Sequence, residues 1–592
     1  MTAYHVTLDG QGYILDLASY RKRLVGAGAG GELAEPRAWT MDDWRKGVGY
    51  ARWEPRVYYS GTNIDPTAGD LRVGRGRTTV STPGAGITDL WSLIVYNGAL
   101  YAPRGDGTDI YSSTDGVTWT NPHDTGYAGH RGLCLFNGWL MIGSSASGAV
   151  TKFDGTTWTD SWVTLTGNKV NALAPWYLTG TTGYLFAGVS QGSGGAVLYR
   201  VDSAGTITTI GSVLEQDITA LIAFGGVLWV ATITESGSSY VGGLYRYDGV
   251  QLVRVTGIAD NAVMSFVEYR GRLWAGSRTR GKLWTISASG LDERWTVPRV
   301  LGIGGTFSYG QAIRALLVDG DRLHVPVVET AGLGMYVGEP LGPVPGVPGA
   351  TAELGWSLPS VGSSGQEPRG IAAFQGQVYL TNKRSSGANV VRVDTTAHTS
   401  AALISASFDA ELPGVDKLAV RVTVVHEALV AGDDVELSYD LEDAGVFTSL
   451  GHSSTGGATS KTFSFGSNVT FRRLRLGVTI LLTDTSRSPA ITSIVVEYRP
   501  RPTLKARWEF DCRLEGSAAL PLVTADGQPE PKTGAQLADT LWTSAAKKVA
   551  LAFTDLDGEA KTVELVALEE RVGQQSQRLG LGTLGRVGLQ EI

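Results

Sequence analysis

The stretch that decides the fold is Asn137-Gly138-Trp139-Leu140-Met141-Ile142-Gly143, in which a tight turn is followed by an apolar strand. The same arrangement recurs from about residue 90 to residue 395, and the second strand opens with leucine, or once with valine. Spacings of 40, 45, 43, 45, 49 and 56 residues between successive turns indicate one repeated supersecondary unit. The turn glycines are Gly98, Gly138, Gly183, Gly226, Gly271, Gly320 and Gly376.

The strands after these turns are apolar on both faces, as in Leu228-Trp229-Val230-Ala231. Successive side chains of a strand point to opposite faces, so such a strand belongs to a sheet packed between two others. Asn97-Gly98 and Asn137-Gly138 predict two-residue hairpin turns. A second turn falls late in the unit, at Asp115-Gly116, Asp154-Gly155 and Asp248-Gly249. Two hairpins per unit predict a four-stranded sheet.

The period distinguishes between two all-β architectures. A string of separate β-sandwiches needs about 100 residues per unit, whereas the observed period is about half of that. Seven four-stranded sheets with this period predict a seven-bladed β-propeller over residues 81–398.

Composition bounds the class of protein. Of 592 residues, 79 are glycine and only 18% are charged, which describes a turn-rich β protein. A net charge of −7 argues against a nucleic-acid partner. Cys134 and Cys512 are the only cysteines, which excludes a disulfide scaffold and a cysteine-ligated zinc or iron–sulfur centre. The first residues lack the pattern of a secretory signal, and no stretch has the about 20 apolar residues of a membrane span.

The segments outside the repeat predict three further units. Residues 1–80 form an N-terminal docking segment with short strands at 5–8 and 13–15, a short helix that starts at Thr40 and stops at Gly47, and an extended stretch at 50–80. That stretch supplies the outer strand that closes the ring, or it binds another subunit. Residues 399–500 hold strands at 402–408, 417–425, 435–441, 461–465, 471–481 and 491–498, which predicts a β-sandwich.

The C-terminal part follows a predicted stiff linker at residues 499–502. Residues 503–592 predict a small α+β domain with strands at 549–553 and 562–568. Thr533 and Gln536 form a capping box for a helix whose apolar face carries Leu537, Leu541, Trp542 and Ala545. Residues 573–592 are expected to form an extended arm.

Motifs that could carry chemistry are few. The glycine run at residues 26–31 lacks the βαβ context of a dinucleotide loop. Asp555, Asp557 and Glu559 could hold calcium, but a hairpin turn explains them more simply. His123 and His130 flank Asp124 in one loop, where a metal or proton-transfer role competes with a solvated rim loop. We assign no catalytic, cofactor-binding or metal residues, and expect no cofactor.

One of the late turns resembles the Asp-box of sialidase-type propellers. Residues 113–119, Ser113 to Trp119, carry the motif with one residue missing before the glycine. In that family the box is a structural turn, so the resemblance supports a propeller and no activity. A glycosidase would also need two carboxylates about 5–9 Å apart.

The two ends of the chain carry a further resemblance, in residues 17–23, 43–50, 58–65, 491–502, 508, 533–537, 541–542 and 553–558. The first three stretches resemble the start of structural proteins from tailed bacteriophages, and the others are similar to C-terminal regions of phage minor tail proteins. The resemblance implies a virion component made in the host cytoplasm. It identifies no catalytic residue.

These observations predict a non-enzymatic structural component of a phage tail, at the tip, baseplate or fibre-attachment region. Its expected partners are other tail proteins in a symmetric multi-copy assembly, with a propeller that scaffolds subunits or touches a host-surface glycan or protein. Two alternatives stay open. One is a glycan-binding receptor-recognition protein, and the other is a propeller glycoside hydrolase.

Overall fold

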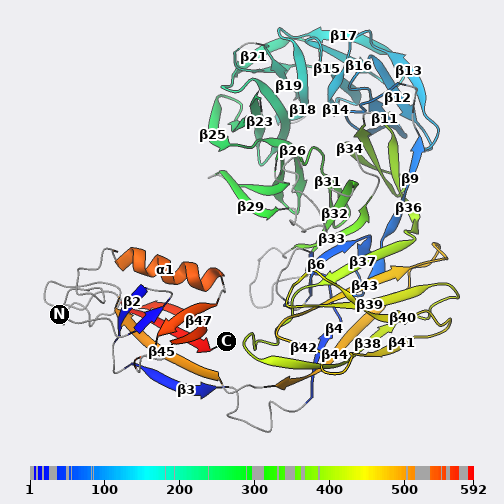
Figure 1. Cartoon of the computed structure of the whole chain (residues 1–592). Helices are drawn as coiled ribbons and strands as arrows, with labels where there is room; N and C mark the ends of the chain where they lie inside the picture. The colour runs from blue at the N-terminus through cyan, green and yellow to red at the C-terminus, as the bar shows by residue number, and fades with distance from the viewer. Residues whose placement is uncertain are drawn as a thin grey trace.

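The computed structural model describes most of the 592 residues. The described residues are 6–8, 11–15, 19–25, 36–48, 53–54, 56–81, 83, 86–179, 182–192, 194–237, 239–279, 281–287, 290–296, 312–329, 332–340, 354–361, 367–384, 387–501, 505–513, 532, 534–547, 550–554, 556, 560–571 and 584–591. Nearly all the regular structure among them is β-strand (Figure 1). Within the same residues, no helix is long and apolar enough to cross a membrane.

The middle of the chain folds into antiparallel four-stranded sheets in sequence order. The first two contain β10 (Ile94–Tyr96), β11 (Ala99–Pro103), β12 (Asp109–Ser113) and β13 (Thr120–Asp124), then β14 (His130–Phe136), β15 (Trp139–Ser144), β16 (Ala149–Phe153) and β17 (Trp158–Thr164). The third contains β18 (Lys169–Thr179), β19 (Thr182–Ser190), β20 (Val197–Val201) and β21 (Ile207–Ser212).

The next sheets continue the series. They contain β22 (Asp217–Phe224), β23 (Val227–Ser236), β24 (Ser239–Tyr247) and β25 (Leu252–Ala259), then β26 (Val263–Tyr269), β27 (Arg272–Ser277), β28 (Lys282–Ser287) and β29 (Gly290–Thr296). β30 (Leu317–Asp319), β31 (Arg322–Glu329), β32 (Gly332–Pro340) and β33 (Leu354–Val361) pair in the same order, inside a larger sheet.

The last sheet of the series takes its outer strand from the N-terminal segment. β34 (Glu367–Phe374), β35 (Gln377–Lys383) and β36 (Val390–Ala397) are followed by β9 (Arg75–Ser81). The first strand of each sheet packs against the first strand of the next, and β34 packs against β10. The sheets therefore form a closed, propeller-like ring (Figure 1). Of the two roles expected for residues 50–80, β9 fulfils that of the outer closing strand.

The predicted hairpin turns are confirmed where local backbone chemistry decides them. Asn97 and Gly98 have φ of 46° and 74°, and Asn137 and Gly138 have φ of 50° and 79°. Two consecutive left-handed residues define the turn that matches the twist of paired strands. Gly183 was predicted to be a turn residue, and this is wrong: it lies inside β19, paired with Tyr177.

The late turns are held by their aspartates. Asp115 Oδ1 accepts hydrogen bonds from the backbone N–H groups of Val117 at 2.8 Å and Thr118 at 2.7 Å. These bonds hold the pKa of Asp115 well below its usual range. Asp154 and Asp248 accept the equivalent backbone bonds in their own turns.

Below the ring, strands from both halves of the chain form two sheets. One continues from β33 through β5 (Gly47–Val48), β6 (Val57–Thr62), β37 (Ser400–Ser405), β43 (Leu474–Leu481), β39 (Asp434–Leu441) and β40 (Thr448–Ser453). The other contains β4 (Arg37–Met41), β44 (Ile491–Arg501), β38 (Asp416–His426), β41 (Ser460–Ser464) and β42 (Thr470–Phe471). β7 (Ile64–Asp65) and β8 (Arg72–Val73) form a separate hairpin. A shared core joins the two sheets, with Trp39 stacked on Phe408 at 4.2 Å between ring centroids.

The two ends of the chain form a third unit, the terminal module (Figure 1). Its sheet has the order β2 (Gln11–Leu15), β1 (Val6–Leu8), β46 (Leu551–Thr554), β47 (Ala560–Arg571), β48 (Leu584–Glu591), β45 (Lys505–Arg513) and β3 (Arg21–Val25). β2 also pairs with β45, which closes the sheet on itself. The helix α1 (Gly534–Lys547) packs on β47. Leu537 and Leu541 of this helix are buried as predicted, but Trp542 is exposed.

Three predictions about the flanking segments are wrong. Residues 40–47 form no helix, because Thr40 pairs with Val495 in β4 and Asp43 instead caps a turn by accepting from the backbone N–H of Arg45. Pro500 and Arg501 are no linker but pair with Lys417 and Asp416. Residues 584–591 are no free arm, because β48 lies between β45 and β47. The domain boundaries at 80, 398 and 500 stay predictions.

Candidate functional site

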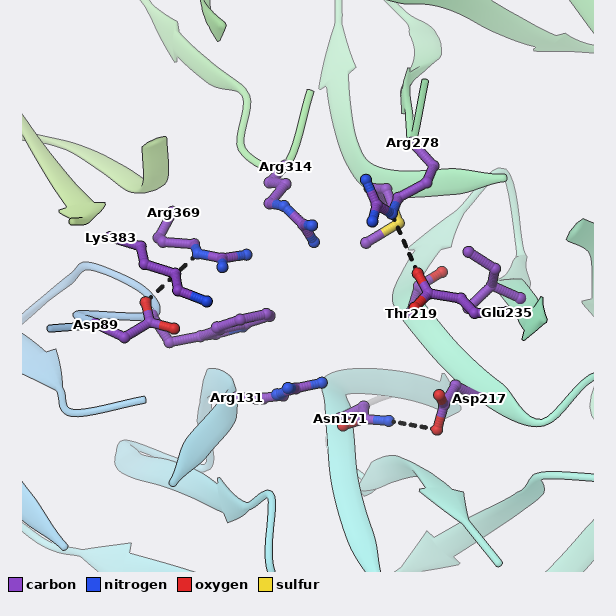
Figure 2. A pocket seen from close by; sticks show the side chains of 13 residues that line it. Asp89, Arg131, Asn171, Asp217, Thr219, Glu235, Arg278, Arg314, Arg369 and Lys383 are labelled. Atoms are coloured by element: carbon purple, nitrogen blue, oxygen red, sulfur yellow. Dashed lines mark hydrogen bonds and ion pairs between the residues drawn. The ribbon is translucent and has the colours of Figure 1, made fainter. Parts of the chain in front are cut away.

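A cavity of about 210 Å³ lies where the first strands of the ring sheets converge (Figure 2). Its lining comes from all parts of the ring: Asp89, Trp91, Arg131, Asn171, Asp217, Thr219, Ile233, Glu235, Met264, Arg278, Arg314, Arg369 and Lys383. Most of these residues lie at the start of a first strand or at the end of a second strand. The cavity is therefore the mouth of the central channel at one face of the ring.

A single repeat position supplies seven of the lining residues. Each directly follows a buried residue at or just before the first strand, as Arg131 follows His130 and Arg314 follows Ile313. Successive side chains of a strand point to opposite faces. The buried residue therefore packs between neighbouring sheets, and the residue after it points toward the channel. The seven residues at this position are Trp91, Arg131, Asn171, Thr219, Met264, Arg314 and Arg369.

The repeat contains this position, but no motif in the sequence marks it as functional. The channel residue lies seven residues before the turn glycine in five of the units, for example at Arg131 before Gly138 and at Arg369 before Gly376. Because side chains alternate between the two faces of a strand, residues at the same distance from the turn point to the same face of their sheets. The turn glycines were therefore sufficient to find five of these residues. Asn171 and Arg314 break the spacing.

On one side of the mouth, three arginines surround the indole ring of Trp91. The Cζ atoms of Arg131 and Arg369 lie 4.4 Å and 4.3 Å from the centroid of the Trp91 ring, and Arg314 lies at 5.9 Å. Guanidinium groups over an indole face gain electrostatic attraction from the ring. Figure 2 shows the three arginines pointing toward the same space. Burial lowers the pKa of Arg131, and it lowers that of Arg314 to about 10.

Carboxylates balance only part of this charge. Glu367 lies between Arg314 at 2.7 Å and Arg369 at 3.2 Å, and Asp89 lies 3.4 Å from Arg369 Nε. Burial opposes ionisation of Glu367, yet the two arginines together lower its pKa. Arg131 has no ion pair with any described residue, and its Nε is buried without a hydrogen-bond acceptor. Arg369 Nη1 is also buried without one.

The opposite side of the mouth presents hydrogen-bond acceptors. Asn171 Nδ2 donates to Asp217 Oδ1 at 3.0 Å, which leaves Asn171 Oδ1 buried without a donor. Glu235 pairs with Arg278 at 3.1 Å. Among the described residues that line the cavity there is no Ser, Cys, His or Tyr. The lining offers charge and hydrogen bonds, which suits binding.

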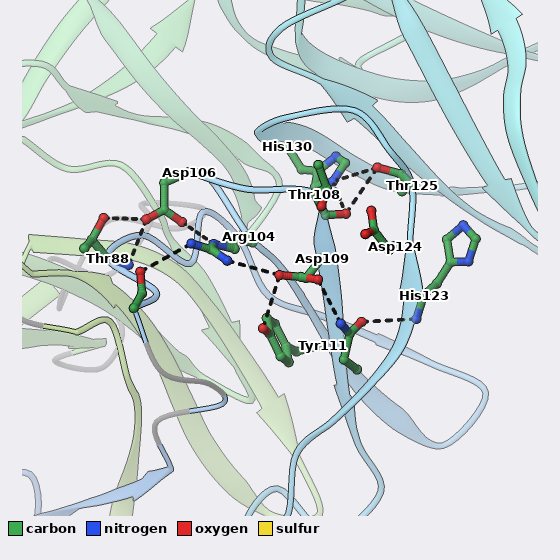
Figure 3. Close-up of polar contacts among 12 residues, drawn as sticks. Thr88, Arg104, Asp106, Thr108, Asp109, Tyr111, His123, Asp124, Thr125 and His130 are labelled. Atoms are coloured by element: carbon green, nitrogen blue, oxygen red, sulfur yellow. Dashed lines mark hydrogen bonds and ion pairs between the residues drawn. The ribbon is translucent and has the colours of Figure 1, made fainter.

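The histidines proposed from sequence do not come together (Figure 3). His123 Nε2 lies 2.9 Å from Asp160, and its ring stacks on Trp158 at 4.5 Å. His130 is buried and its Nε2 lies 3.2 Å from Thr125 Oγ1, and burial lowers the pKa of its imidazole. The part of the chain that the structure describes contains no group of three or more His, Cys, Asp and Glu side chains placed to hold a metal.

The other candidate motifs add no site. Residues 26–31, Asp555, Asp557 and Glu559 lie outside the described residues. Cys134 and Cys512 are both buried. A second, smaller cavity of about 70 Å³ lies beside His324, whose two ring nitrogens meet no partner among the described residues.

Comparisons with known proteins give structural matches only at low TM-scores. No family model matches the chain, and no curated protein matches it. The extracellular domain of a hybrid two-component system from B. thetaiotaomicron is 14% identical with a TM-score of 0.36; the match covers 52% of this chain and only 38% of that one. A streptogramin B lyase is 13% identical with a TM-score of 0.36, over 54% of this chain and 97% of its own.

The WD40 domain of Pan2 from Neurospora crassa is 10% identical with a TM-score of 0.37, over 54% of this chain and 95% of its own. The all-β class of the chain follows from its own strands. Similarity at this level indicates no activity, substrate or partner for it.

Proposed function

We propose that the protein is a non-enzymatic component of a bacteriophage tail, in which a seven-bladed propeller stands on a base built from both ends of the chain. The base consists of the two sheets below the ring and the terminal module. The observation that carries the proposal is the place of the stretches that resemble phage tail proteins. Residues 21–23 lie in β3 of the module formed by the chain ends, whereas residues 58–62 in β6 and residues 491–501 in β44 lie in the two sheets below the ring. The resemblance therefore concentrates in the base, where attachment to a tail is expected.

Two features support a rigid display of the propeller. Seven four-stranded units, the last completed by β9, have first strands that pack in cyclic order. Trp356 of β33 pairs with Gly47 of β5, so one sheet runs from the ring into the base. A continuous sheet transmits orientation better than a flexible linker does. In this proposal the base docks on other tail proteins in a multi-copy virion assembly.

Localisation in particles tests this function directly. Antibodies raised against the purified chain should decorate tails in electron micrographs of particles made from the genome that encodes it. Pre-absorption with the purified chain is the control. Absence of the chain from purified particles, measured by mass spectrometry, would contradict the proposal.

The cavity favours a second role, recognition of the host surface by the propeller. Several charged side chains converge on its lining, and such groups fix the orientation of a ligand. The purified chain should then compete with particles for adsorption to host cells. Equal adsorption with and without an excess of the chain would leave only the scaffolding role. Release of reducing sugar from host envelope would instead favour a hydrolase.

A further inference from the structure

The two sides of the channel mouth differ in the chemistry that they offer. Five cations line the cavity against three carboxylates, although the chain as a whole carries a net charge of −7. Arg131 has no ion pair with any described residue, whereas Asn171 and Asp217 bring an amide and a carboxylate to the same lining. A partly buried cation without a counter-ion is stabilised by an anion that pairs with it. A ligand that carries both an anionic group and hydroxyl groups would therefore complement both sides of the mouth.

We propose that the channel mouth binds an acidic sugar unit, with its carboxylate held by Arg131 and Arg369 and its hydroxyl groups by Asn171 and Asp217. The arginines meet the anion as charge-assisted donors, which are stronger than neutral hydrogen bonds. Hydroxyl groups are the donors that an amide oxygen and a carboxylate accept. This inference concerns the isolated protein and does not depend on its presence in a tail.

The size of the site agrees with a single sugar unit. A volume of about 210 Å³ corresponds to about seven water molecules. Trp91 is not a stacking platform for the ring of the sugar, because two guanidinium groups already lie on it. Instead it packs against each of the two guanidinium groups, so that less side-chain entropy is lost when the anion binds. Met264 and Ile233 supply the apolar part of the lining.

Calorimetric titration of the full chain with matched probes tests the inference. Glucuronic acid should bind at least about tenfold more tightly than glucose, since the two differ in one charged group. It should also bind more tightly than acetate, which has the charge without the hydroxyl groups. Inorganic phosphate and glutamate complete the panel, as a compact anion and a zwitterion.

Two substitutions separate the two halves of the site. Arg131→Gln should weaken the binding of glucuronic acid and of acetate by about tenfold each. Asn171→Ala should weaken the binding of glucuronic acid by a few fold and leave the binding of acetate unchanged. Arg421→Gln is the matched control, because Arg421 is an exposed arginine on β38 of the base that pairs with Glu497. If Arg131→Gln unfolds the ring, Arg131→Lys keeps the charge and should give an intermediate loss.

The outcomes decide the chemistry. Equal binding of glucose and glucuronic acid, no binding of either, or insensitivity to both Arg131 variants would overturn the proposal. Tighter binding of phosphate or glutamate than of glucuronic acid would overturn the assignment to a sugar. A trimer of galacturonic acid distinguishes the source: affinity above that of the monomer indicates a polymer, whereas exclusion of the trimer indicates a free sugar. Either result with the expected variant effects supports the site.

Discussion

The ring and the base of this molecule obtain the same secondary structure in opposite ways. In the ring, nearly every strand pairs with its neighbour in sequence through a short turn, as β14 to β17 do. In the base, pairing joins the far ends of the chain, as when Arg23 of β3 lies opposite Arg507 of β45. Two pairings bring this long-range pairing into the ring, that of β9 with β36 and that of β5 with β33. The ring therefore depends on local turns, whereas the base depends on both ends being present.

Removal of residues 1–25 should have the largest effect, and it should be confined to the terminal module. The deletion removes β1, β2 and β3, which bury Val6, Leu8, Tyr13 and Leu15. Each such side chain contributes about 1.5–3 kcal/mol, and the sum approaches the whole stability of a typical domain, about 5–15 kcal/mol. Limited proteolysis with mass spectrometry should show cleavage between residues 505 and 591 while the ring stays intact.

The control for this deletion is Arg23→Ala, which keeps the strands and removes one exposed ion pair with Glu509. Such a pair contributes about 0–1 kcal/mol, so the pattern of fragments should not change. Continued protection of residues 505–591 in the deletion variant would show that the C-terminal strands fold without the N-terminal ones.

Single core substitutions should separate the two regions next. Trp508 is fully buried in the terminal module, 5.1 Å from Phe553 between ring centroids, and Leu228 is fully buried in the ring. Trp508→Ala should cost about 3–5 kcal/mol and Leu228→Ala about 2–5 kcal/mol. Hydrogen exchange should report the first loss in β45 and β48 and the second in β22 and β23. Loss of protection in both regions from either variant would mean that they unfold together.

This division also explains how much the sequence could predict. Asn137-Gly138 specifies its hairpin within two residues, so the repeat, its turns and the propeller-like class followed from local chemistry. The channel arginines were within reach, because Arg131 and Arg369 keep a fixed distance from their turn glycines. The packing of both arginines against Trp91 could not be predicted, because it requires closure of the ring.

The errors in the base have the same origin. Thr40 and Asp43 carry a helix-cap pattern, but an aspartate that accepts from the backbone two residues on serves a turn equally well. Pairing of Thr40 with Val495 decided the outcome. Residues 584–591 resembled a free arm because the partners of β48, β45 and β47, are visible only after folding. Local pattern could not predict these contacts.

Acid should weaken the ring through a buried histidine. Burial lowers the pKa of His324 from 6.5 to about 4, and the side chain is 5% exposed. The unfolded chain therefore takes up a proton between these two pH values while the folded ring does not. Stability is complete above pH 6.5 and falls by roughly 3 kcal/mol as the pH drops toward 4.

The free energy of urea unfolding of the ring, compared between pH 7 and pH 4.5, measures this effect. His324→Phe is the matched variant, since other units carry Tyr101, Phe186 or Trp229 at this repeat position. The variant should lose most of the pH dependence that the wild type shows in this range. An identical pH dependence in both proteins would assign the effect to other groups, such as His130.

The smallest expected effect tests the claim that the ring depends on its turns. Gly138 has a φ of 79°, and a Cβ added there would meet no atom within 4 Å. Gly138→Ala therefore costs only the strain of a left-handed backbone, about 1–2 kcal/mol. Gly456→Ala in the base is the matched control, because its backbone is not left-handed and its nearest contact of 3.6 Å is ordinary. The midpoint of urea unfolding should fall for the first variant and stay unchanged for the second; equal midpoints would mean that sheet packing, rather than the turn, sets the register of this hairpin.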